Sequence, residues 1–115
     1  MRLVTVRGRM SGKEYSTPFW LLERPDGRYW ISVFGETNTI KNARAAGHVT
    51  VSRGAARDEV RLVEVPVESR LPLLREYLAS NKSPMVRTYF ATPTCTDDEL
   101  RALAPEHTVF KLEPV

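Results

Sequence analysis

Hydrophobic and polar residues alternate along most of this chain, with the period of two that is typical of β-strands. The pattern predicts six strands separated by turns rich in glycine and proline. They are expected at residues 3–6, 14–23, 28–34, 48–52, 57–65 and 107–112. Pro18 has no N–H, which predicts an edge position or a bulge in the second strand. The apolar side chains change face within residues 57–65, which indicates a bulge or burial on both sides.

Three helices are predicted between these strands, at residues 38–46, 67–80 and 96–104. Gly47 ends the first, and Pro72 indicates that the second begins near it. Thr96 and Glu99 form a capping box that opens the third. Prolines make residues 81–95 irregular, and the turn at residues 24–27 predicts a hairpin over residues 14–34. The resulting order β-β-β-α-β-β-α-α-β favours a mainly β, antiparallel barrel over a parallel sheet.

Composition narrows the class of protein without deciding its function. A chain of 115 residues is expected to form a single domain over residues 1–115, with a small core that dimerisation would extend. Its net charge of +3 permits an anionic ligand but does not by itself indicate nucleic acid. The single cysteine, Cys95, excludes an internal disulfide and fits a cytoplasmic location. No apolar run approaches a transmembrane segment, and no signal peptide is expected.

The loop after the first strand carries the clearest candidate chemistry. Gly8 and Gly12 free its backbone, while Arg9, Ser11 and Lys13 supply cations and a hydroxyl. Such a loop can close around a phosphate or a carboxylate, although a solvated basic turn has the same composition. The helix at residues 38–46 likewise has a basic face that is either functional or simply solvated.

Familiar catalytic motifs are absent from the sequence. It contains no dinucleotide fingerprint, no phosphate-loop motif and no cluster of metal ligands. His48 and His107 are expected to be structural, and Cys95 has no features of a nucleophile. An enzyme of this kind would depend on a cofactor for its chemistry, and the basic loop and aromatic strands suit an anionic, planar, redox-active one.

Three blocks of the sequence resemble one family. Residues 7–18, R-G-R-M-S-G-K-E-Y-S-T-P, are similar to the G-R-x-S-G-x…T-P signature of deazaflavin-dependent nitroreductases. Residues 35–47, G-E-T-N-T-I-K-N-A-R-A-A-G, resemble the G-E-T-D-W-V-R-N-A-R-A-A-G block of one actinobacterial branch. Residues 107–112, H-T-V-F-K-L, resemble the family's H-P-V-F-R-L. The order and spacing of the blocks agree over nearly the whole chain.

The resemblance implies a split β-barrel of the flavin-reductase type, often a homodimer. It also implies hydride transfer from reduced coenzyme F420, an 8-hydroxy-5-deazaflavin, to a quinone, an enone or a nitro compound. The residues it assigns to the coenzyme are Arg9, Ser11, Gly12 and Lys13 at the phosphate or tail, Thr17, Pro18 and Phe34 at the ring, and Lys41 and Asn42 on the helix. Tyr15 and Tyr89 are candidate proton donors. Tyr77, Tyr89 and Phe90 either form a substrate wall or pack in the core.

The sequence departs from the family at three positions that bear on the cofactor. Met10 stands where Lys or Arg is usual, Tyr15 where Arg is common, and Thr39 where a Trp is found. The alternative is therefore a non-catalytic split barrel that binds FMN, another anionic ligand, a fatty acid or a partner protein. Binding of single-stranded nucleic acid is a third hypothesis, disfavoured because aromatic and basic residues do not alternate on the strands.

Overall fold

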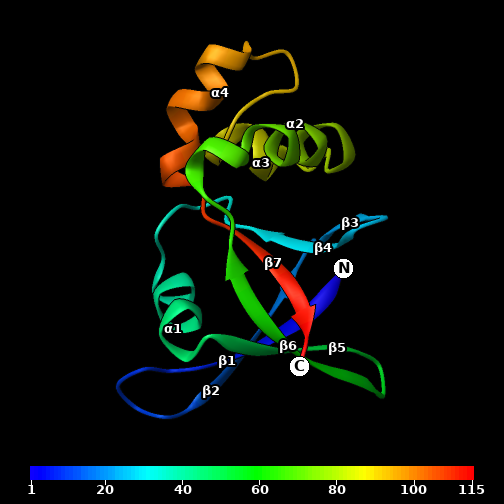
Figure 1. Cartoon of the computed structure of the whole chain (residues 1–115), viewed down its shortest axis with the longest axis vertical. Coiled ribbons are helices and arrows are strands. Elements are labelled where there is room, and N and C mark those ends of the chain that lie inside the picture. The colour runs from blue at the N-terminus through cyan, green and yellow to red at the C-terminus, as the bar shows by residue number, and fades with distance from the viewer.

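The computed structural model describes residues 1–115 and contains one seven-stranded antiparallel sheet, with the strand order β2-β1-β5-β6-β7-β4-β3. The strands are β1 (Arg2–Arg7), β2 (Glu14–Phe19), β3 (Leu22–Arg24), β4 (Gly27–Ile31), β5 (His48–Arg53), β6 (Ala56–Glu64) and β7 (Val109–Pro114). The two edge strands, β2 and β3, are joined through Trp20 and Leu21 alone. The sheet therefore curls on itself as a half-barrel (Figure 1), which confirms the mainly β, antiparallel prediction.

The region of the predicted second strand differs from expectation. It divides at Trp20 and Leu21 into β2, which pairs with β1, and β3, which pairs with β4. Seven strands therefore replace the predicted six, and the hairpin predicted over residues 14–34 is wrong. The actual hairpin is β3–β4, closed by the turn at Pro25 and Asp26. Pro18 lies on an edge strand, where its missing N–H breaks no ladder.

The helices are α1 (Asn38–Ala46), η1 (Val67–Ser69), α2 (Leu71–Ser80), α3 (Pro84–Tyr89), α4 (Asp97–Leu103) and η2 (Ala104–Glu106). Two of them, α1 and α4, begin at side-chain N-caps, Thr37 and Thr96. Gly47 ends α1 with φ 77°, and the capping box of Thr96 and Glu99 is formed at α4. The prediction that residues 81–95 are irregular is wrong over α3, because Pro84 occupies its first turn. None of the helices has the length and apolar character needed to cross a bilayer.

The apolar side chains form two cores on opposite faces of the curled sheet. Trp30 and Phe110 belong to the core inside the half-barrel, where α1 also packs. Tyr29 and Ile31, the neighbours of Trp30 along β4, belong to the outer core beneath α2, α3 and α4. Burial of each large side chain contributes about 1.5–3 kcal/mol. Strand alternation thus lets β4 contribute to both cores, and the three helices cover one end of the sheet (Figure 1).

Strand β6 contains no bulge, contrary to one of the two expectations for it. Its register continues without interruption against β5 and β7. Val60 faces the inner core, whereas Val63 is exposed on the other side. Val65, just beyond the strand, packs against the outer core. The apolar residues therefore change face because the chain contacts the inner core at Val60 and the outer core at Val65.

Candidate functional site

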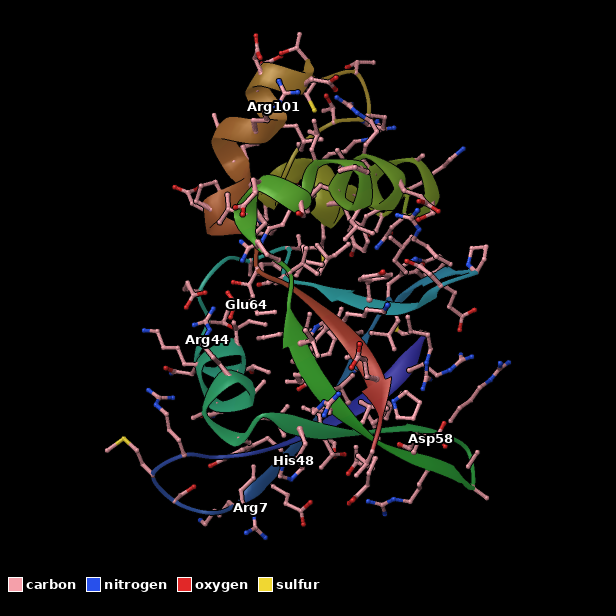
Figure 2. The ribbon with its side chains drawn as sticks, viewed as in Figure 1. Arg7, Arg44, His48, Asp58, Glu64 and Arg101 are labelled. Atoms are coloured by element: carbon pink, nitrogen blue, oxygen red, sulfur yellow. The ribbon has the colours of Figure 1, made fainter.

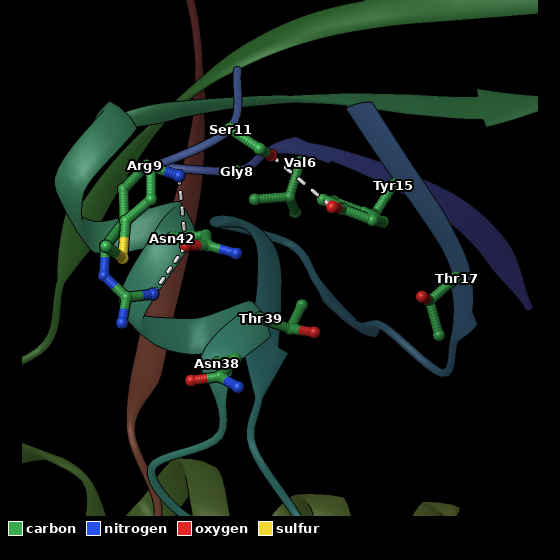
Figure 3. A pocket seen from close by; sticks show the side chains of 10 residues that line it. Val6, Gly8, Arg9, Ser11, Tyr15, Thr17, Asn38, Thr39 and Asn42 are labelled. Carbon is green, nitrogen blue, oxygen red and sulfur yellow. Dashed lines mark hydrogen bonds between the residues drawn. The ribbon is translucent and has the colours of Figure 1, made fainter. Parts of the chain in front are cut away.

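A polar pocket of about 570 Å³ opens between the β1–β2 loop and α1 (Figure 3). It is lined by Val6, Gly8, Arg9, Met10, Ser11, Tyr15, Thr17, Asn38, Thr39 and Asn42. Arg9 is the single charged residue among them, and no carboxylate contributes to the lining. Hydroxyl, amide and guanidinium groups surrounding a space without carboxylates suit an anion rather than a cation.

Glycines shape the loop that forms one side of this pocket. The Gly8 N–H donates to the Lys13 carbonyl over 2.7 Å, and the Gly12 N–H donates to the Gly8 carbonyl over 3.0 Å. Gly12 has φ 73°, a conformation that a side chain would strain. A Cβ atom on Gly8 would lie 2.9 Å from Ser11 Oγ and 3.1 Å from the Tyr15 ring. The tight turn and the approach of Ser11 and Tyr15 therefore depend on these two glycines.

Arg9 ties the loop to α1. Its backbone N–H donates to Asn42 Oδ1 over 3.2 Å, and its Nη1 donates to the same oxygen over 2.6 Å (Figure 3). The rest of the guanidinium has no partner within the protein and remains available to a ligand. The loop and the short helix, both of which the family resemblance assigns to the coenzyme, are thus in direct contact.

Strand β2 forms the opposite wall. Tyr15 and Thr17 are two residues apart, so both side chains lie on the same face of the strand and border the pocket (Figure 3). The Tyr15 hydroxyl lies 3.5 Å from Ser11 Oγ, which accepts a hydrogen bond of 3.2 Å from the Lys13 N–H. This wall offers two hydroxyl groups close to the basic loop.

A second, apolar pocket of about 730 Å³ lies between the β2–β4 region and the helices α2 and α3. Its lining consists of Met1, Thr17, Pro18, Phe19, Trp20, Ile31, Val33, Phe34, Tyr77, Ser80, Asn81, Lys82, Ser83, Met85 and Val86. Thr17 borders both pockets, so the two adjoin at β2. An elongated ligand with a polar end and a flat apolar end would find both environments side by side.

The residues assigned by resemblance divide among three locations. The polar pocket brings together Arg9, Ser11, Thr17 and Asn42, along with the proposed proton donor Tyr15. Pro18 and Phe34 border the apolar pocket instead. Gly12, Lys13 and Lys41 are exposed and line neither pocket, and Tyr89 stacks beside Phe34 with ring centroids 4.9 Å apart.

Several lining residues were not assigned from the sequence. Asn38 and Thr39 lie four and three positions before Asn42, so helical periodicity places all three on one face of α1. That spacing was available to sequence reasoning. Asn81, by contrast, reaches the apolar pocket from the C-cap of α2, and only the tertiary fold reveals its place there, beside the substrate-wall candidate Tyr77.

An ionic network around Arg44 fixes α1 against the sheet. Arg44 belongs to the basic face of this helix, which the sequence left open as either functional or solvated. Arg44 donates to both carboxylate oxygens of Glu36, over 2.8 and 2.7 Å, and its Nε donates to Glu64 over 2.8 Å. Figure 2 shows Arg44 on α1 beside Glu64 on β6. Hydrogen bonds from Arg44 and Thr108 lower the pKa of Glu36 to about 2. Arg44 is therefore occupied in holding the helix and is not free for a ligand.

The two histidines lie apart from the pockets. His107 is buried, its Nδ1 lies 2.7 Å from the Ser32 carbonyl, and its ring stacks on Phe90. Burial lowers the pKa of His107. His48 is exposed, and its Nδ1 lies 3.1 Å from the Ala46 carbonyl.

No protein-family model and no curated protein matches this sequence. Several solved structures match the fold. An FAD-binding protein from Mesorhizobium loti superposes with a TM-score of 0.61 at 17% identity, over 99% of this chain and 80% of that one. The heme storage protein HutZ from Vibrio cholerae gives a TM-score of 0.56 at 10% identity, with the same two coverages, 99% and 80%.

An F420 reductase is also among the similar structures. Its TM-score is 0.55 at 13% identity, over 99% of this chain and 85% of that one. The likeness lies in the fold. This chain shares its split-barrel architecture with these proteins.

Proposed function

We propose that this protein is a reductase that binds coenzyme F420 and serves hydride transfer to a small electrophile such as a quinone, an enone or a nitro compound. The observation that carries the proposal is the junction of the two pockets at Thr17, one polar and without carboxylates, the other apolar. When bound, the deazaflavin supplies the hydride, and the protein binds, orients and shields the reactants.

The residues present fit the charged and the planar parts of such a coenzyme. Arg9 and Ser11 would hold the phosphate or the acidic tail, since both border the polar pocket and the guanidinium of Arg9 has N–H groups to spare. Thr17 would lie at the start of the ring, with Pro18 and Phe34 on the apolar side. Charge-assisted hydrogen bonds contribute about 1.5–3 kcal/mol each, which makes Arg9 the largest single polar contributor.

Titration of the purified protein with oxidised F420, followed by coenzyme fluorescence, tests the proposal directly. We expect a saturable change at micromolar protein, and at least a ten-fold weaker affinity for Arg9→Ala. Arg7→Ala is the matched control, because Arg7 is exposed on β1, carries the same charge and lines neither pocket. No saturable change, or an equal loss in both variants, would contradict the proposal.

A binder of FMN or another anion is the second candidate, and one observation favours it. Met10, Tyr15 and Thr39, the residues at which the sequence departs from the family pattern, all line the polar pocket. The residues that depart from the family pattern therefore lie in the pocket that would contact the coenzyme. Mass spectrometry of ligand retained through purification, together with a parallel FMN titration, separates the two candidates by which ligand saturates at lower concentration.

We further propose that the protein forms a homodimer. Large apolar side chains stay exposed around the mouth of the apolar pocket, among them Trp20, Phe34 and Met85. Tyr89, beside Phe34, is 58% exposed. Pairing of two chains would cover such a surface. Sedimentation velocity at about 100 μM protein should give a dimer, and a monomer at that concentration would count against the proposal.

A further inference from the structure

The wall of the apolar pocket contains one polar pair, contributed by α2 and its C-cap. Tyr77 is only 3% exposed, and its side chain belongs to the outer core. Asn81 caps α2, with its backbone N–H donating to the Tyr77 carbonyl over 2.9 Å. The two side chains meet where Asn81 Nδ2 lies 2.9 Å from the Tyr77 hydroxyl. Both residues border the pocket.

The direction of this hydrogen bond follows from a third contact. The Ser83 N–H donates to Asn81 Oδ1 over 3.1 Å, so the oxygen of the carboxamide is fixed toward Ser83 and the nitrogen toward Tyr77. An amide nitrogen can only donate. The Tyr77 hydroxyl is therefore the acceptor, and its own proton is not used in this bond.

No other side chain or carbonyl accepts the Tyr77 proton. Buried donors are nearly always hydrogen-bonded, and an unmet one costs about 1–3 kcal/mol. Burial raises the pKa of Tyr77, so the hydroxyl keeps its proton at neutral pH. The structure thus holds a protonated, prepositioned donor at the edge of an apolar space, with nothing in the protein to receive it.

We propose that the apolar pocket binds neutral, hydrophobic carbonyl compounds, and that the Tyr77 hydroxyl donates a hydrogen bond to their carbonyl oxygen while Asn81 holds it in position. The inference rests on the proposed function, which places the coenzyme ring against Pro18 and Phe34 of this pocket, and it specifies the class of substrate that meets the ring there. Nine of the fifteen lining residues are hydrophobic, which favours a neutral ligand. Lys82, the charged side chain in the lining, is solvent-exposed, where an ion pair contributes little.

Two probes of nearly the same shape isolate the hydrogen bond. 2-Acetylnaphthalene carries a carbonyl group, and 2-isopropenylnaphthalene replaces that oxygen by a CH₂ group. Equilibrium dialysis of each probe against the full chain, without coenzyme, gives the two affinities. We expect the ketone to bind about three- to ten-fold more tightly than the alkene, since one hydrogen bond separates them.

Two substitutions then locate the donor. Tyr77→Phe removes the hydroxyl and should bring the ketone affinity down to that of the alkene, with the alkene affinity unchanged. Asn81→Asp keeps the shape but presents an acceptor to Tyr77, so the tyrosine proton turns toward the carboxylate and the ketone preference should again disappear. Because Asn81→Asp retains a hydrogen bond at this place, a merely structural role of the pair predicts no such loss.

The inference is overturned if the wild-type protein binds the two probes equally or binds neither. A ketone preference that survives in Tyr77→Phe, or in a folded Asn81→Asp variant, overturns it as well. Tighter binding of 2-naphthoate that Lys82→Gln abolishes would show that the pocket selects anions instead. These dialysis results are independent of the F420 titration, so failure of one proposal remains distinguishable from failure of the other.

Discussion

Arg9 and Asn42 lie 33 positions apart in the sequence, yet two nitrogen atoms of Arg9 donate to the single oxygen Oδ1 of Asn42. One of these nitrogens belongs to the backbone and the other to the guanidinium. The contact therefore fixes both the course of the β1–β2 loop and the direction of its cationic side chain. A loop held in this way is ordered before any ligand arrives, which lowers the entropy that binding must overcome.

Removing the Asn42 carboxamide should release the loop. We expect Asn42→Ala to increase amide hydrogen exchange over residues 8–13 and to weaken F420 binding about five-fold, the equivalent of one hydrogen bond of about 1 kcal/mol. Hydrogen-exchange mass spectrometry and the fluorescence titration measure the two effects. Asn38→Ala serves as control, because Asn38 lines the same pocket without bonding to the loop. Unchanged exchange in Asn42→Ala would show that the loop is held by other contacts.

Replacing each of the two loop glycines by alanine should affect stability and ligand binding to different extents. Gly12→Ala meets no atom within 4 Å but keeps φ 73°, so it should cost about 1 kcal/mol of stability with little effect on binding. Gly8→Ala forces Ser11 and Tyr15 to shift and should weaken ligand binding more than it lowers stability. Urea unfolding and the coenzyme titration on both variants give the comparison. The prediction would be contradicted if the two variants lost stability and coenzyme affinity in the same proportion.

The Glu36 carboxylate should make stability depend on pH in the acidic range. Its pKa falls from 4.5 to about 2 on folding, so its contribution is present above pH 4.5 and is lost as the pH falls toward 2. Because the side chain is 41% exposed, we expect a contribution of only about 1 kcal/mol. Urea unfolding of Glu36→Gln should show a flatter decline below pH 5 than the wild type. Glu14→Gln, at an exposed site without an ion pair, should follow the wild type.

The two tryptophans should report on different parts of the molecule. Trp30 is fully buried in the inner core, whereas Trp20 is 40% exposed and borders the apolar pocket. We expect acrylamide to quench the wild-type protein in two phases and Trp20→Phe only weakly, with emission at short wavelength from Trp30. Equal quenching of both residues would mean that the inner core is open to solvent. Trp20 then becomes the natural reporter of ligands in the apolar pocket.

Local chemistry made much of the fold predictable. The ends of α1 and α4 follow from Gly47 and from the capping box of Thr96 and Glu99, and these signals act within a few residues. The break between β2 and β3 was missed because the residues on both sides of it are extended, and only pairing with different partners separates the two strands. Tertiary contacts, not local preference, decide that boundary.

The candidate site, like the fold, contains some contacts that the sequence predicts and others that depend on the tertiary structure. The meeting of the basic loop and α1 could be expected from the sequence, and Arg9 and Asn42 do touch. The polar pair of Tyr77 and Asn81 could not be placed, because their proximity to β2 depends on how α2 crosses the sheet. Leucine spacing predicts the buried face of α2 but not what that face meets.

Strand β7 alone connects β6 to β4 in the sheet. Until residues 109–114 have been synthesised, the growing chain therefore presents two unpaired strand edges and an incomplete inner core. Pairings between such distant segments close slowly, on the scale of milliseconds to seconds. A nascent chain of this protein should consequently depend on chaperones, or on its own speed of completion, to avoid aggregation at those edges.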